Sequence, residues 1–268
     1  MQQVGGDPHV IDGLAMLRPA DGADKAEGET TAAQLFIGDV VRRHGRVVDI
    51  LTFDALYAQA PVIHACLDHR IDVVIRMKEE RRIIMQDAKG LFDARPADWE
   101  WTERDADGHR VQVKAWDEES LSSWPQVRAP MRMVKVIRAT EKTVLVGRKK
   151  QAETEVMERW MATTCSQQAV PVKMVHRIAA ARWNIENNGV HDLKTYWHMD
   201  HPFVHDPIAI QAWLGILIIA ANLVYTYVYG HLHHVRDWKT PLTVVVEEIK
   251  EQMWWGTSDL AHFLWDSS

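Results

Sequence analysis

An arginine and a glutamate four positions apart are the residues of this chain best placed to do chemistry. Arg182 and Glu186 close a stretch that begins near Val172 and has the apolar spacing of a helix. Side chains four residues apart lie on one helix face, and a carboxylate beside a fixed cation stays ionised. A hard divalent metal ion prefers such an anionic oxygen. Glu186 is therefore a candidate metal ligand, although a plain surface ion pair would show the same spacing.

A second carboxylate follows a predicted strand. Residues 47–53 are apolar and β-branched, which indicates a buried strand, and Asp54 comes directly after it, before a predicted helix over 56–68. Open α/β folds place their reacting groups at the carboxyl ends of strands. Aspartate is also a favoured N-cap residue, and one side chain can do both. Asp54 is the second candidate acid.

The helices and strands predicted around these acids indicate an α/β core that is interrupted by a long insertion. A helix is predicted over residues 30–44 and a strand over 71–76, whereas residues 77–165 mix tryptophan-containing turns with short strands. The predicted divisions are a partial core (1–76), a β-rich insertion subdomain (77–165), returning core helices with Glu186 (166–230) and a C-terminal tail (231–268).

Three segments resemble a DDE transposase of the insertion-sequence-four type. They are Phe53–Ala58, Trp160–Thr164 and Arg182–Asn187, and the resemblance runs from about residue 8 to about residue 230. The separation of Asp54 from Glu186 (186 − 54 = 132 residues) looks like that family's β-rich insertion between its second and third catalytic acids. The resemblance implies an RNase H-like α/β fold, with a mixed sheet and flanking helices.

The chain departs from the family signature at three places. Ala179 stands where the family has a tyrosine, and the signature lysine comes one place late, as Lys194. The first catalytic aspartate is expected well upstream of Asp54, yet only 53 residues precede it. Asp12 is a candidate for that acid, although Asp-Gly is also a common turn sequence. The expectation is a transposase that lacks its N-terminal part and has impaired activity.

The resemblance also implies a chemistry and its partners. Asp54 and Glu186 would hold Mg²⁺ or Mn²⁺, two ions in the intact family, for phosphoryl transfer on double-stranded DNA at transposon ends and target sites. Arg182 would orient Glu186 or bind a phosphate, and Lys194 would neutralise phosphate charge. Trp160 would stack on a base flipped out of the transposon end, or else pack in the core. A homodimer on DNA is compatible with this, and a catalytically dead DNA-binding remnant is the alternative.

Positive charge is concentrated in one part of the chain. The net charge of −6 argues against a protein covered with DNA-binding surface. Residues 128–150, however, hold eight Lys or Arg and one acid, and interleaved apolar residues predict two strands with a turn near 139–141. A basic hairpin can follow DNA phosphates, with Arg148, Lys149 and Lys150 as candidate contacts. A solvated charged sheet face is an equal alternative.

One apolar stretch permits a different interpretation. Residues 208–229 carry no charge and are long enough to span a membrane, so a small membrane protein anchored here is a further alternative. A completely buried helix has the same pattern, and burial is the prediction, with hydrogen-bond partners for Gln211 and Asn222. Two cysteines and a start without a signal-peptide pattern indicate the cytoplasm, and no membrane is expected.

Overall fold

The chain divides into two compact units. The computed structural model describes residues 11, 25–78, 82–105, 107–146, 149–183, 190–231 and 242–255. One unit is Leu17–Arg182, and the other combines Met1–Met16 with Trp183–Ser268. Each unit has an apolar core of its own.

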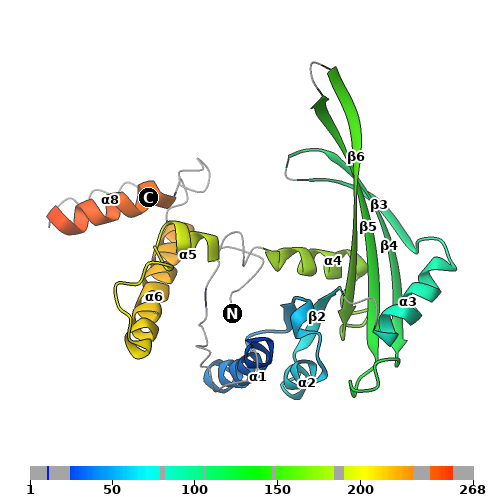
Figure 1. Cartoon of the computed structure of the whole chain (residues 1–268), viewed down its shortest axis with the longest axis horizontal. Helices are drawn as coiled ribbons and strands as arrows, with labels where there is room; N and C mark the ends of the chain where they lie inside the picture. Colours follow the sequence, from blue (N-terminus) through cyan, green and yellow to red (C-terminus); the bar gives the residue numbers. More distant parts are fainter. Residues whose placement is uncertain are drawn as a thin grey trace. The chain divides into compact units, whose positions relative to one another are not determined.

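The larger unit is built on a six-stranded mixed sheet (Figure 1). Strands β1 and β2 are parallel, and the other neighbouring pairs are antiparallel, in the order β1-β2-β6-β5-β4-β3. The bounds are β1 Ile50–Phe53, β2 Asp72–Met77, β3 Trp99–Arg104, β4 Arg110–Leu121, β5 Met131–Val146 and β6 Lys149–Thr163. The predicted α/β fold with a mixed sheet and flanking helices is confirmed. Because β6 pairs with β2, the strands of the predicted insertion continue the core sheet, and the insertion boundaries stay a prediction.

The helices described in this unit lie around the sheet. Their bounds are α1 Lys25–His44, η1 Ala55–Tyr57, α2 Ala60–Asp68, α3 Ile83–Asp93 and α4 Val172–Ala181. The single helix predicted over 56–68 is divided into η1 and α2. Pro61 lies in the first turn of α2, where its missing N–H removes no helical hydrogen bond, so it favours a new helix start there.

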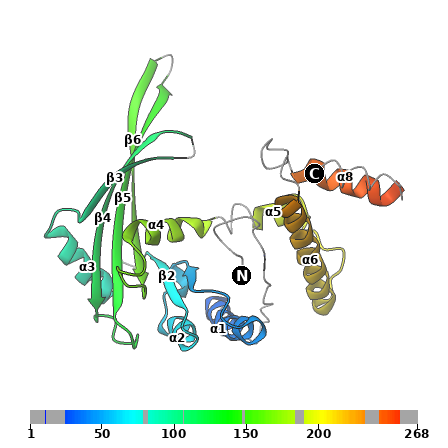
Figure 2. The same cartoon turned by 180° about the vertical axis from the view of Figure 1, so that it is seen from behind.

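Both faces of the sheet are covered by helices. Helices α2 and α3 pack on one face through residues that include Ile63 and Phe92. Helix α4 packs on the other face through Val172 and Val175. Figures 1 and 2 show α3 and α4 on opposite sides of the sheet, and we call its sides the α3 face and the α4 face. Side chains of successive strand residues point to alternate faces. Even- and odd-numbered positions of one strand therefore contact different helices.

The turn predicted near residues 139–141 is wrong. Strand β5 continues without interruption to Val146, and Thr140 pairs with Glu155 in the middle of the β5–β6 ladder. The alternation of the strand persists through this region, and the stretch's single glycine, Gly147, comes after Val146 in the sequence. A tight reversal favours glycine, so its position was the better signal for the turn.

The smaller unit is helical, with α5 His191–Thr195, α6 Pro207–His231 and α8 Leu242–Trp255. Helix α6 contributes Leu217, Ala221 and Tyr225 to the hydrophobic core of this unit. Asn222 has the predicted partners, because its Oδ1 accepts from the Ile11 N–H at 2.9 Å and its Nδ2 donates to the Ile11 carbonyl at 2.7 Å.

This apolar helix is only partly buried within its own unit, and its predicted burial against the sheet stays a prediction. Among the described residues, α6 is the one helix long and apolar enough to cross a membrane, and only 22% of its most apolar window is buried. One side packs in the core, whereas Ile216, Ile219 and Leu223 on the rest of the helix are more than half exposed, and so is Ile208. Gln211 is exposed and therefore needs no protein partner. Length and composition alone are weak evidence for a span, because core helices share them.

Candidate functional site

Asp54 lies at the carboxyl end of β1 and caps the short helix that follows. Its backbone is extended (φ −85°, ψ −177°), and its Oδ1 accepts a hydrogen bond from the Leu56 N–H at 2.9 Å. Within the described part of the chain, the other carboxylate oxygen has no protein partner. The two interpretations of Asp54 are therefore compatible, because capping uses one oxygen and leaves the other for a ligand.

Strand alternation assigns Asp54 to the α4 face. Thr52 pairs with Val74, a core residue beneath α4, and the extended backbone carries the alternation on to Asp54. The parallel register then places Asp54 level with Arg76 at the end of β2. The helix that covers this face, α4, leads to Arg182, which is its C-cap residue. Asp54 and the helix that leads to the other predicted acid thus share one side of the sheet.

Glu186 lies outside the described residues, as does Asp12. Helix α4 ends at Ala181 with Arg182 as its C-cap residue, so the helix predicted to continue from Val172 to Glu186 is interrupted at Arg182, whose N–H donates to the Ile178 carbonyl at 3.3 Å. The convergence of Asp54 and Glu186 at one metal cluster therefore stays a prediction. Lys194 is exposed on α5, in the smaller unit.

Trp160 is a core residue on the opposite side of the sheet. It pairs with Met77 in the β2–β6 ladder, and only 9% of it is exposed. Its ring stacks on Phe92 of α3 at 5.6 Å, and the Lys135 ammonium lies 5.0 Å from the ring centroid. This packing is the alternative that the sequence left open for Trp160. A contact between this ring and a DNA base would require the α3 face to open.

Most of the basic stretch is engaged in ion pairs with acids. Lys135 lies 3.6 Å from a carboxylate oxygen of Asp93. Four other pairs link this stretch to acids elsewhere in the unit, namely Arg128 with Asp68, Arg132 with Asp117, Arg138 with Glu103, and Lys142 with Glu155. Arg148 lies outside the described residues. Lys149 and Lys150 begin β6 opposite Val146 and Leu145 at the end of the β5–β6 hairpin, and their side chains are not described.

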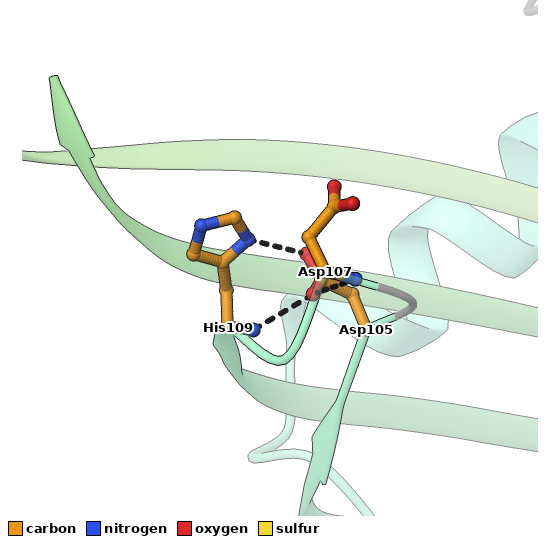
Figure 3. A group of neighbouring side chains, drawn as sticks. All are labelled: Asp105, Asp107 and His109. Carbon is orange, nitrogen blue, oxygen red and sulfur yellow. Dashed lines mark hydrogen bonds and ion pairs between the residues drawn. The ribbon is translucent and has the colours of Figure 1, made fainter.

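A group of possible metal ligands that the sequence analysis missed lies in the turn between β3 and β4. One ligand atom each from Asp105, Asp107 and His109 lies within 4.8 Å of the others (Figure 3). Asp105 Oδ1 accepts from the backbone N–H groups of Asp107 at 3.0 Å and His109 at 2.8 Å, and its Oδ2 lies 3.0 Å from His109 Nδ1.

These hydrogen bonds stabilise the turn between β3 and β4, and this explains why the three side chains lie together. Burial acts in the opposite direction, but the hydrogen bonds from the His109 backbone and ring hold the pKa of Asp105 below its usual value. Gly108, with φ +85°, supplies the left-handed conformation that the turn needs. The Asp-x-Asp-Gly-His sequence was the signal for this feature. It follows β3, at the opposite edge of the sheet from β1 and Asp54.

Comparison with known proteins gives one match. A family model described as the transposase DDE domain matches residues 14–223. The search of curated proteins found no match. The matched range contains the whole sheet and Asp54.

Proposed function

Because the chain belongs to the family of transposase DDE domains, we propose that it acts in DNA transposition by metal-dependent phosphoryl transfer at the ends of a mobile element. The observation that carries the proposal is the match over residues 14–223. The six-stranded mixed sheet with helices on both faces is consistent with the RNase H-like fold of such domains. The motifs around Asp54 and Glu186 support assignment to the insertion-sequence-four type.

Family membership implies a divalent metal ion, and Asp54 fits that requirement. It offers an anionic oxygen that no described protein group uses, at the strand end where α/β folds place their chemistry. Asp54 and Glu186 would hold the metal, with Asp12 as the candidate third acid. Bound Mg²⁺ would activate water and then a 3′-hydroxyl for in-line attack on phosphate.

Other side chains would position the DNA. Arg182, at the end of α4, would orient Glu186 or hold a phosphate. Arg148, Lys149 and Lys150 would contact the backbone from the far end of the β5–β6 hairpin, and Lys194 would neutralise phosphate charge. Family membership also implies that double-stranded DNA is the partner, and a homodimer on DNA remains part of this proposal.

Only Asp54 and Glu186 are assigned as metal ligands in this proposal. Mg²⁺ gives up its water reluctantly, so two carboxylates would hold two ions weakly. We expect slow cleavage unless Asp12 contributes. A catalytically inactive chain that occupies transposon ends is the second candidate, and the departures from the family signature at Ala179 and Lys194 favour it.

Nicking of supercoiled plasmid with Mg²⁺ or Mn²⁺ tests the proposal. The chain should nick slowly, and Asp54→Asn and Glu186→Gln should each abolish nicking, whereas the exposed Asp49→Asn should not. Loss of nicking in Asp12→Asn would identify the third acid. DNA binding without nicking by the unmodified chain would support the second candidate. A chain that neither nicks nor binds DNA would contradict the proposal, as would nicking that survives both acid substitutions.

A further inference from the structure

Three arginines lie side by side on the α4 face of the sheet. Arg76 of β2 pairs with Met161, two positions along β6 from Arg159. Arg159 pairs with Val136, two positions along β5 from Arg138. Such diagonal positions on neighbouring strands share one face, within reach of long side chains. The three guanidinium groups therefore form a row across three adjacent strands.

This row carries more positive charge than the described residues neutralise. Arg138 Nη2 lies 3.1 Å from Glu103 Oε1. Within the described part of the chain, neither Arg76 nor Arg159 has a carboxylate partner. Burial, together with the charges of Arg138 and Arg76, lowers the pKa of Arg159. The arrangement is electrostatically unfavourable in the free protein, and an anion would relieve it.

Polar groups around the row also lack partners. The Nε atoms of Arg138 and Arg159 are buried without an acceptor, and so is Nδ1 of His176. His176 lies on α4, over the same face, and is only 5% exposed. The Thr52 hydroxyl, on this face of β1, is likewise buried without a partner. Buried polar groups are ordinarily hydrogen-bonded, so unpaired polar groups along one face of the sheet favour the binding of a polar ligand there.

The chemistry and position of the row indicate what that ligand is. The planar guanidinium fork matches the oxygens of a phosphate, with two parallel N–H donors for two oxygens. Arg76 is level with Asp54 on the same face of adjacent strands. A phosphate held by this row would therefore lie beside the candidate metal ligand.

We propose that Arg76, Arg138 and Arg159 form a binding site for a backbone phosphate of the DNA, next to the phosphate at Asp54. This inference rests on the proposed function, because it assumes a DNA substrate. The site would orient the strand through charge and fork geometry, without reading bases. None of these arginines belongs to the motifs that suggested the family.

Substitution of Arg159 gives a test in which the affinity for DNA should fall while the thermal stability does not. Removing one of three crowded cations should leave the melting temperature of the DNA-free Arg159→Gln variant unchanged or raised. Its affinity for duplex oligonucleotide should fall, and the slope of log K against log salt should flatten by about 0.9 if one phosphate is no longer neutralised. Arg159→Lys restores the positive charge and should therefore recover part of the DNA affinity and of the salt slope. Lys142→Gln, which removes an already paired cation from the same strand face as Arg138, is the matched control and should bind as the unmodified chain does.

The other results separate the possible failures. If the unmodified chain binds duplex DNA and both Arg159→Gln and Arg76→Gln keep its salt slope, the inference is overturned while the proposed function stands. If the unmodified chain binds no DNA, the proposed function fails. Inorganic phosphate at constant ionic strength should raise the melting temperature of the unmodified chain and not that of Arg159→Gln. A shift with phosphate in a chain that binds no DNA would overturn the assignment to DNA.

Discussion

The buried pair of Arg132 and Asp117 links three segments of the larger unit. The guanidinium donates twice to the carboxylate, at 2.7 Å each, and also to the carbonyls of Cys165 at 3.3 Å and Val170 at 2.7 Å. It therefore ties β5 to β4 and to the loop before α4. The role of a single charged residue depends on its partner. Arg132 belongs to the basic stretch, yet its partners give it a structural role.

Arg132→Met should destabilise the protein strongly. The substitution leaves the Asp117 carboxylate buried without compensation, which typically lowers the free energy of unfolding by about 3–5 kcal/mol. Urea unfolding followed by circular dichroism measures the change. Lys142→Met on the same strand removes an exposed pair and should leave the midpoint unchanged. Equal effects of the two substitutions would contradict the structural role of Arg132.

His176 should make the protein less stable in acid. Burial, with the charges of Arg159 and Arg138, lowers its pKa to about 4. In the unfolded chain the pKa returns to about 6.5, so between these values the unfolded state binds the extra proton and stability falls as pH falls. The loss should be on the order of 3 kcal/mol by pH 4.

Urea midpoints at several pH values between 7 and 4 test this prediction. His176→Gln should flatten the decline over that interval. His44→Gln, at the exposed end of α1, should keep the steep decline of the unmodified chain. A decline that is equally steep in His176→Gln would show that other groups cause the acid sensitivity.

At the scale of elements, α6 shows how an apolar helix contains one polar anchor. Both polar atoms of the Asn222 side chain bond the backbone of Ile11, a residue 211 positions away. Ile11 is therefore held by an amide in a mostly apolar helix. An anchor of this kind fixes register, because a shift along the helix would leave the Ile11 groups unpaired.

Asn222→Leu should loosen the smaller unit. Leucine satisfies neither the N–H nor the carbonyl of Ile11, and each unsatisfied buried group lowers stability by about 1–3 kcal/mol. Gln211→Leu, on the same helix but exposed, should change stability by less than about 0.5 kcal/mol. Hydrogen exchange of the Ile11 amide should accelerate in Asn222→Leu only. Unchanged protection there would contradict the anchor.

The sequence predicts elements better than it predicts their pairing. Runs of apolar, β-branched residues located β1 and β2, the 3.6-residue period located α4, and a long uncharged apolar stretch located α6. It could not show that Trp160 and Asp54 lie on opposite faces, since that depends on the pairing of β2 with the distant β6. The turn after Val146 had a local signal in Gly147.

The candidate site was predictable only in part for the same reason. Asp54 follows a strand and precedes a helix start, which are local features of the sequence. The arginine row consists of residues from three strands, separated by up to 83 positions (159 − 76 = 83). Only the sheet order brings them together, and no spacing in the sequence indicates it.

At the scale of the whole molecule, the proposed function requires one DNA path along the larger unit. The path would run from Asp54 across the arginine row to the far end of the β5–β6 hairpin, which Figure 1 shows extending beyond β3 and β4. Because the cations of residues 128–146 are paired with acids, the proposed path depends on the arginine row, and residues 148–150 would add to its positive charge.

Replacing Arg148, Lys149 and Lys150 together with alanine should weaken duplex DNA binding. The slope of log K against log salt should flatten by about 0.9 for each phosphate that these side chains no longer neutralise. Fluorescence anisotropy at several salt concentrations measures it. Alanine at Arg42 and Arg43, which pair with Asp39 on α1, is the control and should keep the slope. An unchanged slope in the triple variant would exclude the hairpin end from the DNA path.

Metal binding at Asp54 is the decisive property of the proposed active site. Calorimetric titration with Mn²⁺, in an Asp105→Asn background that disrupts the group of possible ligands found among the described residues, should show binding by the otherwise unmodified chain. Loss of an outer-shell partner already weakens metal affinity about 10–100-fold, so Asp54→Asn should weaken it by at least about tenfold. Asp49→Asn, just before the start of the same strand, should leave it unchanged. If Asp54→Asn binds Mn²⁺ as tightly as its parent, Asp54 is not a metal ligand, and the proposed active site is wrong.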